Sequence, residues 1–132
     1  MRRSPCPIAA ALDLFGDKWT LLVLRDLFCG RKRYGEFAAS LEKIPTNILA
    51  ERLTRLEEAG LIASTPYQTN PPRYDYALTA AGRSLRPVLQ ELVNWGRRHF
   101  ADTRVRAEFT GNPDDSPCLP DFVKLPKRPA RA

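Results

Sequence analysis

Leucines recur at helical spacing near the middle of the chain. Leu49, Leu53 and Leu56 occupy positions i, i+4 and i+7, which lie on one face of a helix. Thr46 is a suitable N-cap residue, because its hydroxyl can accept a hydrogen bond from a first-turn amide, and Gly60 suits the left-handed end. The pattern predicts an amphipathic helix with a polar opposite face. Taken alone, that face fits a solvated surface helix better than a binding helix.

Three more helices are predicted ahead of this one. The first covers residues 7–15, and the second covers 18–29 with Asp17 as its cap. The second helix is apolar nearly all round, so we expect it to be the buried centre of the domain. After a short extended segment at 31–34, Gly35 can cap a third helix. The third and fourth helices then follow each other across a tight turn.

A β-hairpin is predicted directly after the fourth helix. Residues 61–67 are rich in β-branched and apolar side chains, and residues 73–79 alternate between the two faces of a strand. The connection at 68–73 contains Asn-Pro-Pro, which is typical of a turn. We therefore expect two short strands around a polar loop that is stiffened by proline.

The last predicted helix is capped by Thr79 and reaches about Phe100. Pro87 should kink this helix or mark a break in its first turns. Its apolar stripe admits two interpretations, packing on the second helix or a helix shared between two subunits, and the pattern alone favours neither. The stripe consists of Leu85, Val88, Leu89, Leu92 and Trp95.

Composition and charge bound the domain organisation. The 132 residues suffice for one domain with its own core, which we place at 1–102, and the proline-punctuated basic segment 103–132 is expected to be a flexible tail. No apolar run approaches the ~20 residues that span a bilayer, and no signal peptide is evident. We therefore expect a cytoplasmic protein without membrane contacts. The net charge of +6 favours a polyanionic partner, although many basic proteins bind none.

The three cysteines do not suggest a disulfide framework, because their number is odd and no secretion signal is evident. No cysteine pair has the spacing of a metal site, and the chain has one histidine, so we expect neither a metal nor a cofactor. Cys29 ends an apolar helix and is interpreted as an inert core thiol. Cys118 is interpreted as incidental, with a resolving thiol as the alternative.

The order of these elements predicts a fold. Four helices, a hairpin and a final helix, with a tight turn before the fourth helix, make a mainly α fold with a small β-hairpin (α+β). This is the architecture of a winged helix-turn-helix. An α-helix fits the major groove of B-DNA, which is about 12 Å wide, and its N-terminal residues reach the base edges. The fourth helix is therefore the candidate recognition helix, with Thr46 to Ala50 entering the groove.

Three side chains of this helix have the chemistry of base contacts. Asn47, Glu51 and Arg55 are the residue types that hydrogen-bond to adenine, cytosine and guanine edges, respectively. Glu51 has a second interpretation that the sequence leaves open, an ion pair with Arg55 at i+4. Asn47 and Arg55 are the stronger predictions for base contact.

The other predicted contacts are to the DNA backbone. Thr46 and Thr54 can donate a hydrogen bond to phosphate or pack on a thymine methyl group. Arg73, in the predicted wing, and Arg33, in the basic cluster 31–33, can contact phosphate.

Several blocks of sequence occur in register over roughly residues 6–96. They are Cys6-Pro7, Gly16-Asp17-Lys18-Trp19, Arg33-Tyr34-Gly35-Glu36-Phe37, Leu49…Arg52-Leu53…Leu56-Glu57…Gly60-Leu61, Pro71-Pro72-Arg73-Tyr74-Asp75-Tyr76…Leu78-Thr79…Gly82 and Leu85…Pro87-Val88-Leu89…Leu92…Trp95-Gly96. Together they resemble the HxlR-type winged helix-turn-helix regulators. The resemblance implies a bacterial transcription factor, which we expect to be a repressor, that binds operator DNA as a homodimer. One departure is Gly35, where family members usually carry Ser or a similar cap residue.

The resemblance also implies how the chain dimerises. Dimer contacts in that family come from the first and last helices, so the resemblance favours a last helix that is shared between subunits. The implied dimer contacts are Ile8, Leu12, Leu89, Leu92 and Trp95.

Cys6 has two interpretations. In a subset of the resembled family the N-terminal cysteine senses oxidants or electrophiles, and Cys6 lies near Arg2 and Arg3, just ahead of the first helix. Both the helix N-terminus and nearby cations favour the thiolate. The alternative is that Cys6 only packs against the dimer partner. A small-molecule or redox effector is therefore an open expectation.

A protein-interaction module without a DNA target is the alternative function. It is favoured by the acidic side chains Glu51, Glu57 and Glu58 on the fourth helix. An enzyme is not expected, because the sequence has no carboxylate pair in an apolar setting and no triad spacing.

Overall fold

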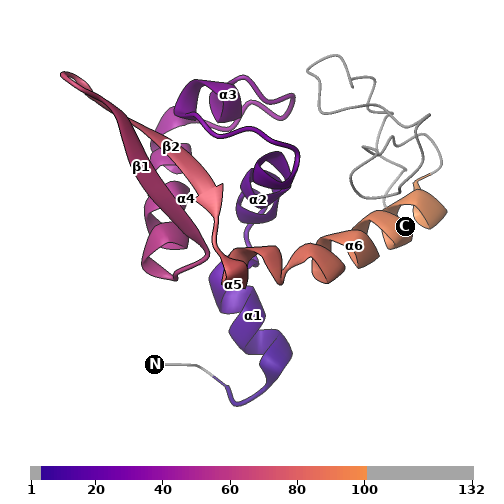
Figure 1. The fold of residues 1–132 in the computed structure, drawn as a ribbon. Helices are drawn as coiled ribbons and strands as arrows, with labels where there is room; N and C mark the ends of the chain where they lie inside the picture. Colours follow the sequence, from indigo (N-terminus) through magenta and orange to yellow (C-terminus); the bar gives the residue numbers. More distant parts are fainter. Residues whose placement is uncertain (1–3, 101–132) are drawn as a thin grey trace.

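The computed structural model of the protein describes residues 4–100. It confirms a mainly α fold with one small hairpin, the winged helix-turn-helix arrangement (Figure 1). The predicted tail at 103–132 and the domain boundary at 102 lie outside these residues. The elements are α1 (Pro7–Phe15), α2 (Thr20–Phe28), α3 (Tyr34–Ala38), α4 (Thr46–Glu58), β1 (Ile62–Thr69), β2 (Pro72–Leu78), α5 (Ala80–Arg83) and α6 (Arg86–His99).

Helix α2 is the centre of the molecule, as its nearly continuous apolar sequence predicts. It packs against α4, α6 and strand β2 (Figure 1). The leucine stripe of α4 is fully buried, with Leu49, Leu53 and Leu56 each no more than 2% exposed. The predicted division of α4 into an apolar and a polar face is therefore confirmed. The buried apolar core consists of Val23, Leu24, Leu27, Phe37, Ile44, Leu49, Leu53, Leu56, Leu61, Ile62 and Leu89.

The start of α2 depends on Asp17. Its Oδ2 accepts hydrogen bonds from the backbone amides of Trp19, at 3.0 Å, and Thr20, at 3.1 Å. These amides have no partner within the helix, so the carboxylate satisfies them as a cap does. The predicted capping role is confirmed, although the helix begins at Thr20 rather than at Lys18.

The predicted caps of α3 and α4 are wrong by one or two residues. Helix α3 begins at Tyr34, because Glu36 reaches back and its Oε1 accepts from the amides of Lys32 and Arg33, both at 2.9 Å. Gly35 therefore lies inside the helix. Helix α4 begins at Thr46 itself, with Pro45 as the flanking residue.

The hairpin is longer and its turn tighter than predicted. Strands β1 and β2 are antiparallel, with an irregularity between Pro66 and Gln68, and only Asn70 and Pro71 separate them. The predicted extended segment 31–34 ends one residue early, because Tyr34 already belongs to α3, and Arg33 forms a bridge with Asp75 of β2. The amide of Tyr76 donates to the carbonyl of Lys32 at 2.7 Å. The hairpin is therefore attached at its base to the segment that precedes α3.

The last predicted helix is broken, as Pro87 suggests. The hydroxyl of Thr79 accepts from the amide of Gly82 at 3.1 Å and so caps the short helix α5. Helix α6 then starts after Ser84 and Leu85, with Pro87 in its first turn, where a missing N–H costs nothing. In Figure 1, α1 and α6 both project from the body of the molecule. Within residues 4–100, no helix has the length and apolarity to cross a bilayer.

Candidate nucleic-acid interface

One face of α4 is exposed over three turns. It lies opposite the buried leucines, on a helix that packs next to strand β1 (Figure 1). The spacing of its residues is that of a single helical face, so they can meet a groove together. The exposed residues of this helix are Thr46, Asn47, Ala50, Glu51, Thr54, Glu57 and Glu58, and the sequence assigned the first five to DNA.

The N-terminal end of this face is held by α3. The phenolic hydroxyl of Tyr34 donates to the backbone carbonyl of Thr46 at 2.7 Å. In the turn between the two helices, Lys43 has a φ of 53°, a left-handed conformation that is uncommon for a lysine. Lys43 is exposed and precedes the first residue of α4 by three positions. Sequence reasoning missed both residues.

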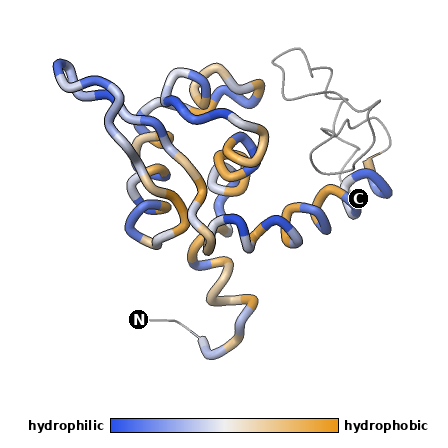
Figure 2. The backbone as a smooth tube through the Cα atoms, in the orientation of Figure 1, coloured by the Kyte–Doolittle hydropathy of each residue, from blue (hydrophilic) through white to orange (hydrophobic). Residues whose placement is uncertain are grey.

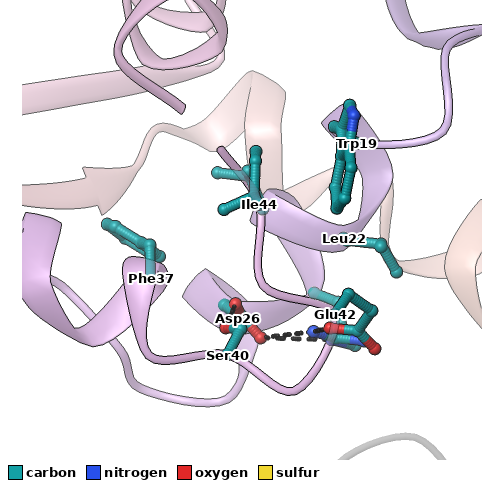
Figure 3. Close-up of a pocket in the computed structure, with 9 residues that line it drawn as sticks. Trp19, Leu22, Asp26, Phe37, Ser40, Glu42 and Ile44 are labelled. Atoms are coloured by element: carbon teal, nitrogen blue, oxygen red, sulfur yellow. Dashed lines mark hydrogen bonds and ion pairs between the residues drawn. The ribbon is translucent and has the colours of Figure 1, made fainter. Parts of the chain in front are cut away.

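A buried charged network stabilises the helix-turn-helix from below. The guanidinium of Arg25 donates to Asp26 Oδ1 at 2.9 Å and to the two oxygens of Glu42 at 2.8 Å. Asp26 and the hydroxyl of Ser40 are hydrogen-bonded to each other and are only 2% and 5% exposed. Asp26, Ser40 and Glu42 gather at the turn (Figure 3). The network ties α2 to the loop between α3 and α4.

This network is structural rather than a ligand site. The cavity beside it has a volume of about 10 Å³, which is room for one water molecule. Burial alone would lower the pKa of Arg25, but its hydrogen bonds to Glu42 and the charges of Asp26 and Glu42 raise the pKa above its usual value. Arg25 is therefore a permanent cation between two carboxylates.

Arg55 does not face the same way as Asn47. Its Nη2 lies 3.3 Å from the carbonyl oxygen of Leu14 and 3.4 Å from that of Asp13, at the C-terminal end of α1. A cation there complements the negative end of the helix dipole. The prediction that Arg55 reads guanine conflicts with this geometry, because its guanidinium is directed at α1.

Glu51 is part of the same arrangement. Its carboxylate pairs with Arg52 and lies 3.7 Å from the Nε of Arg55. Of the two interpretations left open by the sequence, the structure contains the i, i+4 ion pair. Thr54 is also used inside the helix, since its hydroxyl donates to the carbonyl of Ala50 at 3.0 Å.

The wing presents one exposed arginine. Arg73 is opposite Gln68 in the register, and the Gln68 side chain donates to the carbonyl of Pro71 at 3.1 Å, which stiffens the turn. The hairpin tip is strongly hydrophilic (Figure 2). Arg73 is exposed near the start of β2, and its contact with phosphate stays a prediction.

Arg33 has partners within the protein. Its Nε donates to Asp75 Oδ1 at 2.8 Å, and its guanidinium lies 3.9 Å from the centre of the Tyr67 ring. The hydrogen bond that Arg33 donates to Asp75 is the main reason that the pKa of Arg33 is raised. The predicted phosphate contact therefore has a competitor, because Asp75 and Tyr67 hold this guanidinium against the wing.

The predicted dimer residues divide into two groups. Ile8 is 70% exposed, Leu12 49%, Leu92 50% and Trp95 52%, so α1 and α6 both present uncovered apolar side chains. Leu89 is 6% exposed and belongs to the core of this chain. Leu89 is thus used within this chain, where one side of the α6 stripe packs on α2, and its role as a dimer contact stays a prediction.

Two cysteines fall within the described residues. Cys6 is an exposed free thiol and is the N-cap residue of α1. Cys29 is partly buried and packs against the apolar core, and its interpretation as an inert core thiol stays a prediction. Cys118 lies outside the described residues.

Comparison with known proteins gives this architecture a family. Residues 14–104 match the HxlR-like helix-turn-helix family. Among curated relatives, the chain is 44% identical over 93 residues to the helix-turn-helix-type transcriptional regulator Rv3095 of Mycobacterium tuberculosis. That match covers 70% of this chain and 58% of Rv3095, so the chain spans less than two thirds of the length of this relative.

Two solved structures share both fold and sequence with the chain. The redox regulator HypR in its oxidized form is 32% identical with a TM-score of 0.64, over 70% of this chain and 96% of HypR. Quinone-bound YodB from B. subtilis is 31% identical with a TM-score of 0.60, over 70% of this chain and 98% of YodB. The relatives are transcriptional regulators and not enzymes. The chain therefore belongs to the HxlR-like helix-turn-helix family.

Proposed function

We propose that this protein binds double-stranded operator DNA with the N-terminal half of α4 in the major groove and the hairpin on the backbone or in the minor groove. The observation that carries the proposal is the exposed face of Thr46, Asn47, Ala50 and Thr54, together with exposed Arg73 on the hairpin that packs on α4 through β1. The helix is held by Tyr34 and by the buried charged network, so its side chains would meet the groove already ordered.

The proposed contacts follow from side-chain chemistry. Asn47 would read adenine through two hydrogen bonds, and the methyl group of Ala50 would pack on thymine. Thr46, Lys43 and Arg73 would contact phosphate, aided by the positive end of the α4 dipole. Base reading is not assigned to Glu51 or Arg55, since both are engaged at the side of α4 that faces α1.

We further propose that the functional unit is a homodimer formed by α1 and α6. Ile8 and Leu12 on α1, and Leu92 and Trp95 on α6, are exposed apolar side chains on the two helices that project from the body. Helix α6 also has an open groove. It is lined by Pro87, Val88, Glu91, Leu92, Trp95 and Arg98. Exposed apolar surface of this kind marks an interaction site.

Operator occupancy by such a dimer would exclude RNA polymerase, so we propose that binding represses transcription. We place the protein in the cytoplasm, where the chromosome is accessible. Release would come from an oxidant or electrophile acting at Cys6. The support is the exposed thiol at the N-cap of α1, a proposed dimer helix, together with the HypR and YodB structures, which are titled as a redox regulator and as quinone-bound.

The test is selection of bound fragments from genomic DNA by the full chain, followed by titration of a recovered fragment at several salt concentrations. A DNA-binding regulator enriches a common motif, and its affinity falls steeply with salt because counterions are released. Repeating the titration with a quinone and with Cys6→Ser tests the sensor. Recovery of no common motif, with no salt dependence, would contradict DNA binding.

A protein-interaction module is less well supported by the geometry. It drew on the acidic side chains of α4, but Glu51 is paired with Arg52 and Arg55. Glu57 accepts a hydrogen bond from the hydroxyl of Ser64 at 2.7 Å. Two of the three acids therefore serve the fold, and little acidic surface remains for a partner.

A further inference from the structure

The hairpin is attached to the helix-turn-helix through Arg33. This residue precedes α3, and it forms an isolated antiparallel bridge with Asp75 of β2. Its Nε donates to Asp75 Oδ1 at 2.8 Å, and its guanidinium lies over the ring of Tyr67 on β1, 3.9 Å from the ring centre. One side chain therefore contacts both strands of the wing while its backbone leads directly into α3.

The contacts of the wing become sparse beyond this point. Nearer the body, Tyr76 packs edge-on against Phe37 with ring centres 6.3 Å apart, and its amide is bound by Lys32. Towards the tip, Thr69 and Arg73 are exposed. The contacts of Arg33 thus stand between the buried base of the hairpin and the part that would reach DNA.

We propose that Arg33 and Asp75 are positioning residues that fix the angle of the wing relative to α4, so that Arg73 and Asn47 can contact DNA at the same time. This inference rests on the proposed function. It differs from the sequence prediction for Arg33, which assigned that residue to phosphate. An arginine suits the task, because its planar group can donate in the plane to a carboxylate while its face stacks on a ring.

The proposal can be tested by whether neutralising Asp75 weakens or tightens DNA binding. Its carboxylate is 30% exposed on the wing, where a negative charge repels DNA. If Asp75 had only an electrostatic influence, its neutralisation would tighten DNA binding. If Asp75 holds the wing through Arg33, its neutralisation releases the wing. Ordering the wing on DNA then costs free energy, so DNA binding becomes weaker.

The experiment compares Asp75→Asn with Glu58→Gln, which removes one acid from the exposed end of α4. Affinity for a recovered operator fragment is measured at fixed salt. We expect Asp75→Asn to weaken binding by about three- to tenfold, the cost of ordering one or two side chains, and Glu58→Gln to leave it equal or tighter. Equal or tighter binding by Asp75→Asn would overturn the proposal.

A second variant and a second measurement separate this proposal from DNA binding itself. Arg33→Lys keeps the charge but loses the planar group, so it should bind more weakly, whereas a simple phosphate contact would tolerate it. Without DNA, amide hydrogen exchange at residues 67–75 should be faster in Asp75→Asn, and exchange in α4 should be unchanged. Unchanged exchange at 67–75 overturns the positioning role, whereas loss of motif selection by the wild-type protein overturns the proposed function.

Discussion

Arg52 donates through its Nε to Oδ2 of Asp17 at 2.8 Å, the same carboxylate oxygen that accepts from the first amides of α2. The side chain of Arg52 is 18% exposed and that of Asp17 22%, so the ion pair is largely shielded from water. One carboxylate thus joins α4 to the junction between α1 and α2. The ion pair between Arg52 and Asp17 therefore holds the candidate recognition helix against this junction.

The first prediction concerns this contact. Asp17→Ala removes both a helix cap and the partner of Arg52, so the free energy of unfolding should fall by about 2–3 kcal/mol. Urea denaturation followed by circular dichroism measures it. Glu58→Ala on the exposed end of α4 is the matched acid control, and its effect should stay within about 0.5 kcal/mol. Similar losses for the two variants would contradict the role of Asp17.

The second prediction is a pH dependence from the same residue. Burial alone would raise the pKa of Asp17, but hydrogen bonds from Arg52, Thr20 and the Trp19 amide, with the charge of Arg52, hold it well below its usual range. A carboxyl with a lowered pKa in the folded state stabilises the protein above the unfolded pKa, which is about 3.9. That contribution is lost as pH falls below about 4.

The stability difference between wild type and Asp17→Asn should therefore be constant from neutral pH down to about 5 and shrink at lower pH. Urea titrations at several pH values between 7 and 3 check it. The lowered pKa of Glu36, caused first by its hydrogen bond from the Lys32 amide, acts in the same direction and remains in both proteins. A difference that grew on acidification would have the wrong sign.

The third prediction separates the two ends of α4. Asn47→Ala should weaken binding to a recovered operator by about tenfold or more and relax base preference at one position. Arg73→Ala should lower the slope of log affinity against log salt by about 0.9, as expected for one lost phosphate contact. Arg55→Ala removes a charge from the same helix and should leave base preference unchanged, because this guanidinium faces α1. A relaxed base preference in Arg55→Ala would show that Arg55 contacts bases after all.

The fourth prediction uses the two sides of α6. Trp95→Asp places a charge on the exposed side and should shift the protein from dimer to monomer in size-exclusion chromatography with light scattering, with its fold retained. Leu89→Ala empties a core position and should lower the free energy of unfolding by about 2–4 kcal/mol. A monomeric wild-type protein, or a dimeric Trp95→Asp, would exclude α6 as the interface.

The fifth prediction rests on the close approach of α5 to the end of α4. A Cβ at Gly82 would lie 2.1 Å from the carbonyl oxygen of Leu61 and 3.0 Å from a methyl group of Leu78. Backbone must move to admit it, so Gly82→Ala should destabilise the fold by about 1–3 kcal/mol or more. A Cβ at Gly35 meets nothing within 4 Å, and Gly35→Ala in α3 should stabilise slightly. Thermal denaturation distinguishes the two.

The features that the sequence predicted correctly are those with a local cause. The leucine stripe of α4 depends on spacing within one helix, and the break before α6 depends on the missing N–H of Pro87. The exposure of Asn47 follows from the first of these patterns. The helix starts were less accurate, because the cap of α3 is set by Glu36 reaching backwards and not by the residue that looks like a cap.

The roles of the arginines could not be predicted in the same way. Arg33 is bound by Asp75, which is 42 residues away in the sequence, and Arg55 reaches Leu14, which is 41 residues away. Side-chain type indicates what an arginine can bind, whereas the fold decides which acceptor is near. For the same reason, the helical period alone could not predict that Leu89 is buried whereas Leu92 is exposed.

The short break between α5 and α6 has a consequence for operator geometry. Helix α5 is fixed beneath the hairpin by Thr79, whereas α6 leaves the body to present Leu92 and Trp95 (Figure 1). In a dimer built on α6, the angle at Ser84 and Leu85 sets how far apart the two recognition helices stand. Successive major grooves on one side of B-DNA are about 34 Å apart. Substitutions at Ser84 and Leu85 would therefore change the preferred half-site spacing while leaving every base-reading side chain in place.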